Sequence, residues 1–137
     1  ASVITPNLPE AGVLLAREVT DAGQMEQAAY DLFDLSGGHC AVLLKGGHLS
    51  DALCRDLLFD GKEITELTSP RQDTKNTHGT GCAMSSFLAA SLARTGDLKE
   101  AFRLTKEWIG RAISSSEKLD CGQGHGPIHH FVNLWKE

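Results

Sequence analysis

Two glycines and a cysteine stand directly ahead of a predicted amphipathic helix, within residues 76–82 (NTHGTGC). Glycine lets the backbone approach a ligand closely, and the first turn of a helix presents unbonded amides at its positive dipole end. This combination favours an anion site built from Gly79, Thr80 and Gly81. The same pattern is also typical of an ordinary tight turn, so the motif alone leaves both interpretations open.

Cys82 follows these glycines at the expected N-terminus of the helix, where a thiol loses its proton more readily than elsewhere. The thiolate would be able to accept a hydroxyl proton as a general base. A nucleophilic role is the second option, but no Cys-His-Asn order accompanies this residue. A small buried thiol is the third, and we favour it for Cys40, Cys54 and Cys121.

Lys45 comes directly after the apolar run 41–44 and is followed by Gly46, Gly47 and His48. In open α/β sheets, ligands bind beyond the carboxyl ends of the strands. A lysine at such a place can reach a phosphate. A solvated lysine in a turn is the alternative interpretation.

Asn7 and Glu10 also stand just beyond a predicted strand, in the sequence TPNLPEA. Their oxygens are spaced to hold a hydrated Mg²⁺ ion. The pattern is equally typical of a helix start with a glutamate in its first turn, and on local grounds we favour that interpretation.

Oxygen ligands, a lysine and a helix N-terminus together suit a nucleoside triphosphate with Mg²⁺. They favour phosphoryl transfer, in which positioning and charge stabilisation supply most of the catalysis. The loop is not GxxxxGK[ST], so a P-loop enzyme is excluded. Six scattered histidines lack the spacing of a zinc site.

The elements that must position these residues alternate along the chain. Extended runs at 1–5 and 41–44 flank a helix that begins near Asp21 and ends at Gly37, with apolar residues at helical spacing. A β-hairpin is predicted at 56–67 around Asp60-Gly61, one helix after residues 79–81 that ends near Arg94, a second at 98–116, and a glycine-rich loop at 122–126. This order predicts an α/β fold with a mostly parallel sheet flanked by helices.

Composition restricts the class of protein. The 137 residues suit about one domain, and no apolar run approaches the roughly 18 residues that would span a bilayer. The net charge of −5 argues against nucleic-acid binding. Four widely spaced cysteines predict reduced thiols and a cytoplasmic location.

The block NTHGTGC resembles the signature of the hydroxymethylpyrimidine/phosphomethylpyrimidine kinases, thiamine-biosynthesis enzymes of the ribokinase-like superfamily. TPNLPEA at 5–11, KGGHL at 45–49 and GHGP at 124–127 resemble further landmarks of that family, in the same order. The resemblance spans the whole chain and implies a ribokinase-like fold. It also implies ATP-dependent phosphorylation of hydroxymethylpyrimidine and of its monophosphate.

Residue roles follow from the same resemblance. Cys82 would be the base toward the substrate hydroxymethyl group, and the amides of residues 79–82 would surround the transferred phosphate. Asn7 and Glu10 match the superfamily's NxxE motif, which is tied to Mg²⁺. Contacts to ATP are implied for Lys45, Thr77, Thr80, Gly124 and Gly126.

Members of this family are about twice as long, and the chain resembles their C-terminal half. Residues 1–137 are therefore expected to form one C-terminal portion of a kinase domain, with a companion N-terminal half or a second copy as partner. The abrupt apolar start at Val3-Ile4 agrees with that expectation. A pyridoxal-type kinase and a non-catalytic nucleotide-binding module remain the alternatives.

Overall fold

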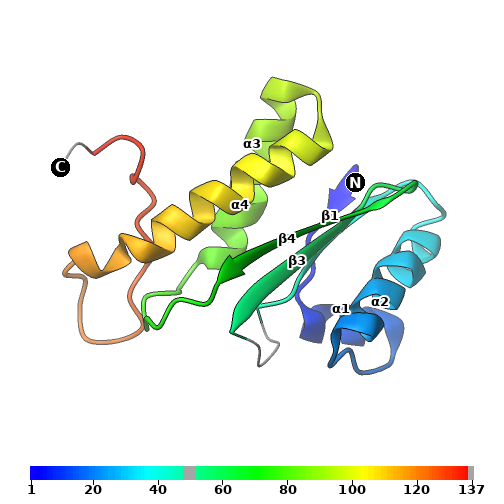
Figure 1. Ribbon diagram of the computed structural model, residues 1–137, viewed down its shortest axis with the longest axis horizontal. Helices are drawn as coiled ribbons and strands as arrows, with labels where there is room; N and C mark the ends of the chain where they lie inside the picture. The colour runs from blue at the N-terminus through cyan, green and yellow to red at the C-terminus, as the bar shows by residue number, and fades with distance from the viewer. Residues whose placement is uncertain (48–51, 136–137) are drawn as a thin grey trace. The chain divides into compact units, whose positions relative to one another are not determined.

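The computed structural model describes residues 1–47 and 52–135 and divides into two compact units, Ala1–Arg71 and Gln72–Glu137. Figure 1 shows the elements of both units in chain order. His48 of the predicted lysine motif lies outside the described residues. Among the described helices, none combines the length and apolar character that a membrane span requires.

One sheet organises the first unit, with its strands in the order β1-β2-β3-β4. The strands are β1 (Val3–Ile4), β2 (Ala41–Lys45), β3 (Leu53–Phe59) and β4 (Ile64–Pro70). β1 and β2 are parallel, whereas β3 is antiparallel to both β2 and β4. The described sheet is therefore mixed rather than mostly parallel. Residues 46–52 are too short for the crossover of a dozen or more residues that a parallel β3 would need.

The predicted hairpin is confirmed as β3 and β4, which are longer than the expected 56–67. Asp60 Oδ1 accepts hydrogen bonds from the amides of Lys62 and Glu63, both at 2.9 Å, and so closes the turn. Gly61 has φ +91°, and a Cβ there would lie 2.6 Å from Phe33 Cζ. Glycine is required at this position because the turn packs directly on the Phe33 ring.

Helices α1 (Leu8–Leu15) and α2 (Ala22–Leu35) pack on one face of this sheet. Asp21 caps α2 by accepting the amide of Gln24 at 2.8 Å. The predicted apolar stripe of α2 is confirmed and meets alternate residues of β2 and β3. The buried cluster includes Met25, Ala28, Ala29, Leu32, Val42, Leu44, Leu57 and Phe59.

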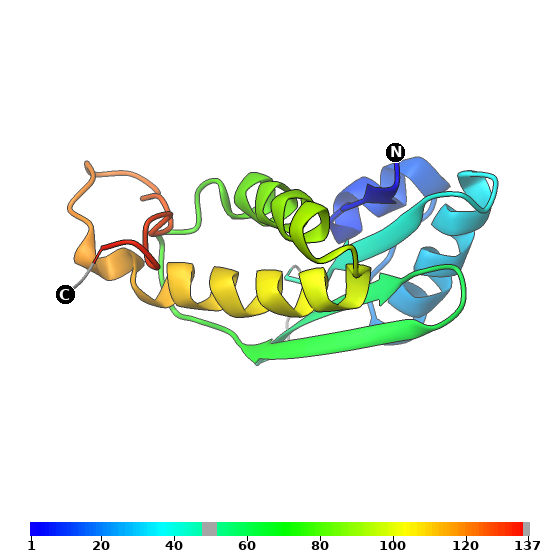
Figure 2. The ribbon, with the colours of Figure 1, turned by 90° about the horizontal axis from the view of Figure 1, so that it is seen from above.

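The second unit contains α3 (Thr80–Thr95), α4 (Leu98–Ser114) and the short 3-10 helix η1 (Ser116–Lys118). Figure 2 shows α3 and α4 side by side. Their facing sides are apolar, as the spacing predicts, and the rings of Phe87 and Trp108 stack with centroids 4.5 Å apart. Fully or nearly fully buried side chains here are Met84, Leu88, Phe102, Ile109, Ala112 and Ile128.

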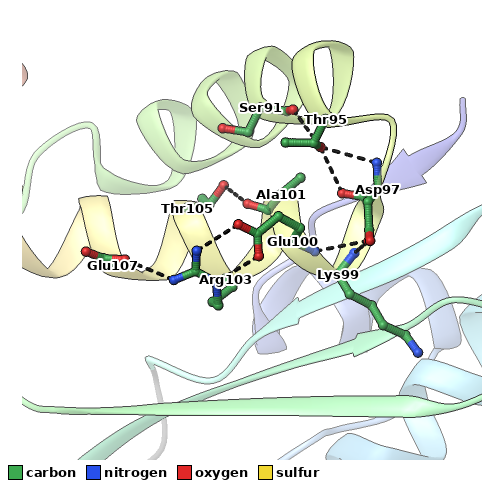
Figure 3. A network of polar contacts seen from close by, with 9 residues as sticks. All are labelled: Ser91, Thr95, Asp97, Lys99, Glu100, Ala101, Arg103, Thr105 and Glu107. Carbon is green, nitrogen blue, oxygen red and sulfur yellow. Dashed lines mark hydrogen bonds and ion pairs between the residues drawn. The ribbon is translucent and has the colours of Figure 1, made fainter.

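Side-chain hydrogen bonds hold the turn between α3 and α4 (Figure 3). Thr95 Oγ1 donates to the carbonyl of Ser91 at 2.9 Å and accepts the amide of Asp97 at 3.2 Å. Asp97 Oδ1 in turn caps α4, accepting the amides of Lys99 and Glu100 at 2.9 and 3.1 Å. The predicted break at Gly96 is thus fixed on both sides.

Arg103 lies between two carboxylates on the exposed side of α4, 2.7 Å from Glu100 and 3.3 Å from Glu107 (Figure 3). Its hydrogen bond to Glu100 lowers the pKa of that carboxyl, and it raises the pKa of the Arg103 guanidinium. Exposed pairs of this kind contribute little to stability because solvent screens them.

Candidate functional site

The anion loop, residues 79–82, starts α3 with a left-handed turn. Gly79 is the N-cap, with φ 80° and ψ 2°, and no side chain caps the helix. Within residues 1–47 and 52–135, the amides of Gly79, Gly81 and Cys82 make no hydrogen bond. Three unbonded donors in the first turn of a 16-residue helix form a site suited to an anion.

Thr77 and Thr80 hold this turn together. The carbonyl of Thr77 accepts the Thr80 amide at 3.3 Å and the Thr80 hydroxyl at 2.7 Å. In this arrangement the Thr80 hydroxyl offers only its lone pairs to other groups. Thr77 and Thr80 therefore shape the loop, and a phosphate contact from Thr80 stays a prediction.

Cys82 is exposed in the first turn of α3, and its thiol is free. Its backbone carbonyl accepts the hydroxyl of Ser86 at 2.9 Å, while no described residue bonds to its sulfur. The sulfur is thus accessible from solvent beside the unbonded amides. One end of α3 therefore presents both an exposed thiol and hydrogen-bond donors.

The anion loop is joined to the glycine-rich tail loop by backbone pairing. The amide of His78 donates to the carbonyl of Gly126 at 3.1 Å, and His78 and Pro127 form an isolated parallel bridge. Gly124 and Gly126 line a cavity of about 390 Å³ in the second unit. Two motifs that the sequence analysis treated separately are thereby adjacent.

The charged lining of this cavity was not identified from the sequence. Its side chains are Asp73, Lys75, Glu117 and Asp120. Asp73 and Lys75 lie between β4 and α3, Glu117 lies in η1 and Asp120 follows it, and no periodic pattern marks these short segments. Spacing gave no signal that they share a cavity.

In the first unit, Asn7 and Lys45 lie side by side at the carboxyl ends of β1 and β2. They form an isolated parallel bridge, and the Lys45 amide donates to the carbonyl of Pro6 at 2.9 Å. The predicted strand is buried, since Val42 and Leu44 have no exposed surface, but Lys45 is its last residue rather than the residue after it. One edge of the sheet therefore carries both features.

Asn7 and Glu10 form a capping box at the start of α1. Asn7 Oδ1 accepts the Glu10 amide at 2.8 Å, and Glu10 Oε2 accepts the Asn7 amide at 2.7 Å. The local interpretation of a helix start is confirmed. Oε1 of Glu10 makes no hydrogen bond with the described residues, so the carboxylate keeps one oxygen for a further ligand.

The oxygen ligands at this edge of the sheet fit Mg²⁺, but they do not form a site in which protein side chains alone surround the ion. Among the described residues, no group of three or more His, Cys, Asp or Glu side chains is placed to hold a metal. Mg²⁺ usually keeps several waters and binds one or two carboxylates together with substrate phosphates. The Glu10 carboxylate and the side-chain oxygen of Asn7 are suited to that mode.

Asp56 is a further residue of this edge that sequence reasoning missed. It pairs with Lys45 in the β2–β3 register and is only 6% exposed, and its Oδ1 accepts the Gly46 amide at 3.0 Å. A Cβ on Gly46 would overlap the carbonyl of Arg55, so the backbone of Gly46 lies directly against β3. The available signal was a single aspartate at the start of the apolar run DLLF.

Comparisons with known proteins agree with one another. A family model described as phosphomethylpyrimidine kinase matches residues 1–129. The hydroxymethylpyrimidine/phosphomethylpyrimidine kinases of Rhizobium meliloti and Salmonella typhimurium are each 43% identical to the chain, over 100% and 98% of it. The alignments include 51% and 50% of those proteins, so the chain spans about half the length of the curated relatives it matches.

A solved structure also matches this chain over about half of its own length. The pyridoxal kinase of Bacillus subtilis, solved as an ADP complex, is 36% identical with a TM-score of 0.88. The match covers 99% of this chain and 50% of that one. The predicted ribokinase-like α/β fold is confirmed by this likeness.

Proposed function

Because this chain belongs to the phosphomethylpyrimidine kinase family, we propose that it forms the nucleotide and catalytic portion of an ATP-dependent kinase. The acceptors are 4-amino-5-hydroxymethyl-2-methylpyrimidine and its monophosphate, on the route to thiamine. The observation that carries the proposal is the free Cys82 thiol beside three unbonded amides at one helix end.

The three unbonded amides serve the transferred phosphoryl group. Gly79, Gly81 and Cys82 supply neutral donors fixed by the backbone, and the helix dipole adds partial positive charge. Such preorganised donors stabilise the charge on the equatorial oxygens as the phosphoryl group moves. They need no reorientation during the reaction.

Cys82 acts as the general base. As the substrate oxygen bonds to the γ-phosphorus, its proton passes to Cys82, whose sulfur acts as the thiolate, and the bond from the γ-phosphorus to the β–γ bridging oxygen breaks. ADP leaves with that oxygen, so atoms and charge balance. The accessible sulfur in the first turn of α3 supports this role.

Lys45 contributes positive charge to the phosphates of ATP. Asn7 and Glu10 would hold a hydrated Mg²⁺ ion through their oxygens. Mg²⁺ supplies charge neutralisation to the phosphates when it is present. The bridge between Asn7 and Lys45 supports a shared role at this sheet edge. Gly124 and Gly126 would approach the nucleotide from the cavity wall.

The relatives contain about as much sequence again outside the matched region. We assign the contacts to the pyrimidine ring to that region, present as a companion segment, with a second copy of the chain as the other option. We place the protein in the cytoplasm, where its four cysteines would stay reduced.

The direct experiment is Cys82→Ala in the complete protein that carries this chain. We expect turnover with hydroxymethylpyrimidine to fall at least 100-fold, while Mg-ATP affinity measured by calorimetry changes less than threefold. Cys54→Ser, a partly buried thiol in β3, is the matched control and should retain wild-type turnover. Wild-type turnover in Cys82→Ala would remove Cys82 as the base.

A pyridoxal-type kinase is the second candidate, favoured by the likeness to the pyridoxal kinase of B. subtilis. Side-by-side turnover of pyridoxal and hydroxymethylpyrimidine separates the two. Tight Mg-ATP binding without turnover of either would instead favour a non-catalytic nucleotide-binding module.

A further inference from the structure

Asn76 precedes the anion loop, and its side chain has no part in the reaction proposed above. Nδ2 of Asn76 donates to the carbonyl of Ser116 at 3.2 Å, where η1 begins. Its backbone amide donates to Thr74 Oγ1 at 3.2 Å. One residue therefore links the segment before α3 to the segment after α4.

The same side chain lies against the backbone of Gly126. A Cβ built on Gly126 would lie 2.8 Å from Asn76 Cγ and would overlap Asn76 Oδ1. Carbon atoms of real side chains do not approach that closely, so a larger residue at position 126 would force the Asn76 side chain to shift. Asn76 is thus held between the Ser116 carbonyl and the Gly126 backbone.

The contact between Asn76 and Gly126 lies next to the backbone pairing that leads into the anion loop. The His78 amide donates to the Gly126 carbonyl at 3.1 Å, and Gly79 follows immediately. Asn76 and Gly126 also both line the 390 Å³ cavity. A shift of Gly126 relative to Asn76 must therefore move the His78 amide and the start of the anion loop.

We propose that Asn76 is a positioning residue: through Ser116 and Gly126 it sets the place of the anion loop and so preorganises its free amides for a nucleoside triphosphate. The ligand in this statement rests on the proposed function. The positioning of the anion loop by Asn76 does not rest on it, and hydrogen exchange of the His78 amide measures that positioning separately.

Two substitutions disturb the contact between Asn76 and Gly126, one from each side. Asn76→Ala removes the bond to Ser116 and leaves space beside Gly126. Gly126→Ala forces its new methyl group into the Asn76 side chain. Because Ala at position 76 makes room for Ala at position 126, the double variant should be no worse than Asn76→Ala alone.

The test uses the full chain without ligand and then with Mg-ATP. By NMR, amide hydrogen exchange at His78 should become at least tenfold faster in each single variant, because the bond to Gly126 opens more often. By calorimetry, the Kd for Mg-ATP should rise about tenfold in each. The double variant should match Asn76→Ala in both measurements.

Gln72→Ala is the matched control. Gln72 Nε2 donates to the carbonyl of Gly110 at 3.0 Å, which is another side-chain bond from the same segment to α4. This bond is exposed and does not touch Gly126. Its loss should leave both the His78 exchange rate and the Kd unchanged.

Unchanged His78 exchange in folded Asn76→Ala would overturn the proposal, as would additive effects in the double variant or an equal effect of Gln72→Ala. If Asn76→Ala does not fold, Asn76→Asp takes its place, since it keeps the side-chain shape and loses the donor. If the complete wild-type protein that carries this chain does not bind Mg-ATP, the proposed function is overturned, and the exchange measurement still decides on Asn76.

Discussion

Asn7 and Lys45 form a parallel β-bridge at the carboxyl edge of the sheet, although the whole of α1 and α2 separates them in sequence. The bridge connects a residue of the capping box to the residue that ends the buried strand β2. The candidate Mg²⁺ ligands and the candidate phosphate-binding lysine thereby belong to one rigid edge. The effect of a substitution at the candidate Mg²⁺ ligands can therefore be compared with that of a substitution at Lys45.

Lys45→Met should weaken Mg-ATP binding about tenfold, or ~1.4 kcal/mol, because a positive charge near the phosphates is lost. The difference should shrink as salt screens the charge. Calorimetry at low and high salt measures both effects. Lys62→Met, an exposed lysine in the β3–β4 turn, should bind as the wild type does, and equal losses in the two variants would contradict a local role for Lys45.

Glu10→Gln should separate the helix cap from the metal site. Glutamine can keep the side-chain bond to the Asn7 amide, so the unfolding free energy should change by less than about 0.5 kcal/mol. The Mg²⁺ concentration needed for half-maximal ATP binding should rise about tenfold, since a carboxylate ligand is lost.

Asn7→Ala supplies the contrast, because it breaks the cap and should cost about 1 kcal/mol of unfolding free energy. Chemical denaturation together with Mg²⁺ titration gives both quantities. An unaltered Mg²⁺ requirement in Glu10→Gln would leave Glu10 with a capping role only.

Gly79→Ala and Gly96→Ala should have equal effects on stability and different effects on binding. Both glycines flank α3 in left-handed conformation, with φ 80° and 66°, and a Cβ at either would meet nothing within 4 Å. Each substitution should cost about 1 kcal/mol of unfolding free energy from backbone strain. Only Gly79→Ala should also weaken Mg-ATP binding, by about tenfold, because it alone alters the anion loop.

Asp31 should make stability pH-dependent in the acid range. Hydrogen bonds from Gln27, at 2.9 Å, and from Arg17, at 2.6 Å, lower the pKa of Asp31 below its ordinary value of 3.8. A lowered pKa stabilises the fold above the ordinary value, and this contribution is lost as the pH falls through the lowered one.

Asp31→Asn should therefore cost about 0.5 kcal/mol at pH 7, a small value because the ion pair is about one-third exposed. The difference from wild type should disappear in denaturation curves as the pH falls below the lowered pKa of Asp31. Asp34→Asn on the same helix is the control. A cost of Asp31→Asn that stays constant with pH would exclude the ionised carboxylate as its cause.

Local patterns predicted the elements well, because each depends on neighbours in the sequence. The stripe of α2, the turn at Asp60-Gly61 and the end of α3 at Gly96 all follow from side-chain spacing or glycine. The antiparallel direction of β3 relative to β2 did not follow, because it depends on the length of the connection 46–52 rather than on the composition of β3.

The candidate site was predicted in its residue types more than in its contacts. The Asn7–Glu10 pair and the start of α3 are local, and the sequence identified both. The bond from Asn76 to Ser116 joins residues 40 positions apart, and no pattern in either segment points to the other. Asp56 was missed for a similar reason, since its partner is the Gly46 amide on the neighbouring strand.

Trp108, which stacks on Phe87, is one of the chromophores that allow the unfolding of the two units to be followed separately. Both tryptophans of the chain, Trp108 and Trp135, belong to the second unit, and its one tyrosine, Tyr30, belongs to the first. Tryptophan fluorescence therefore follows the unfolding of the second unit, and tyrosine absorbance that of the first. Coincident denaturation midpoints from the two chromophores would mean one cooperative transition, and separate midpoints would mean that each half melts independently.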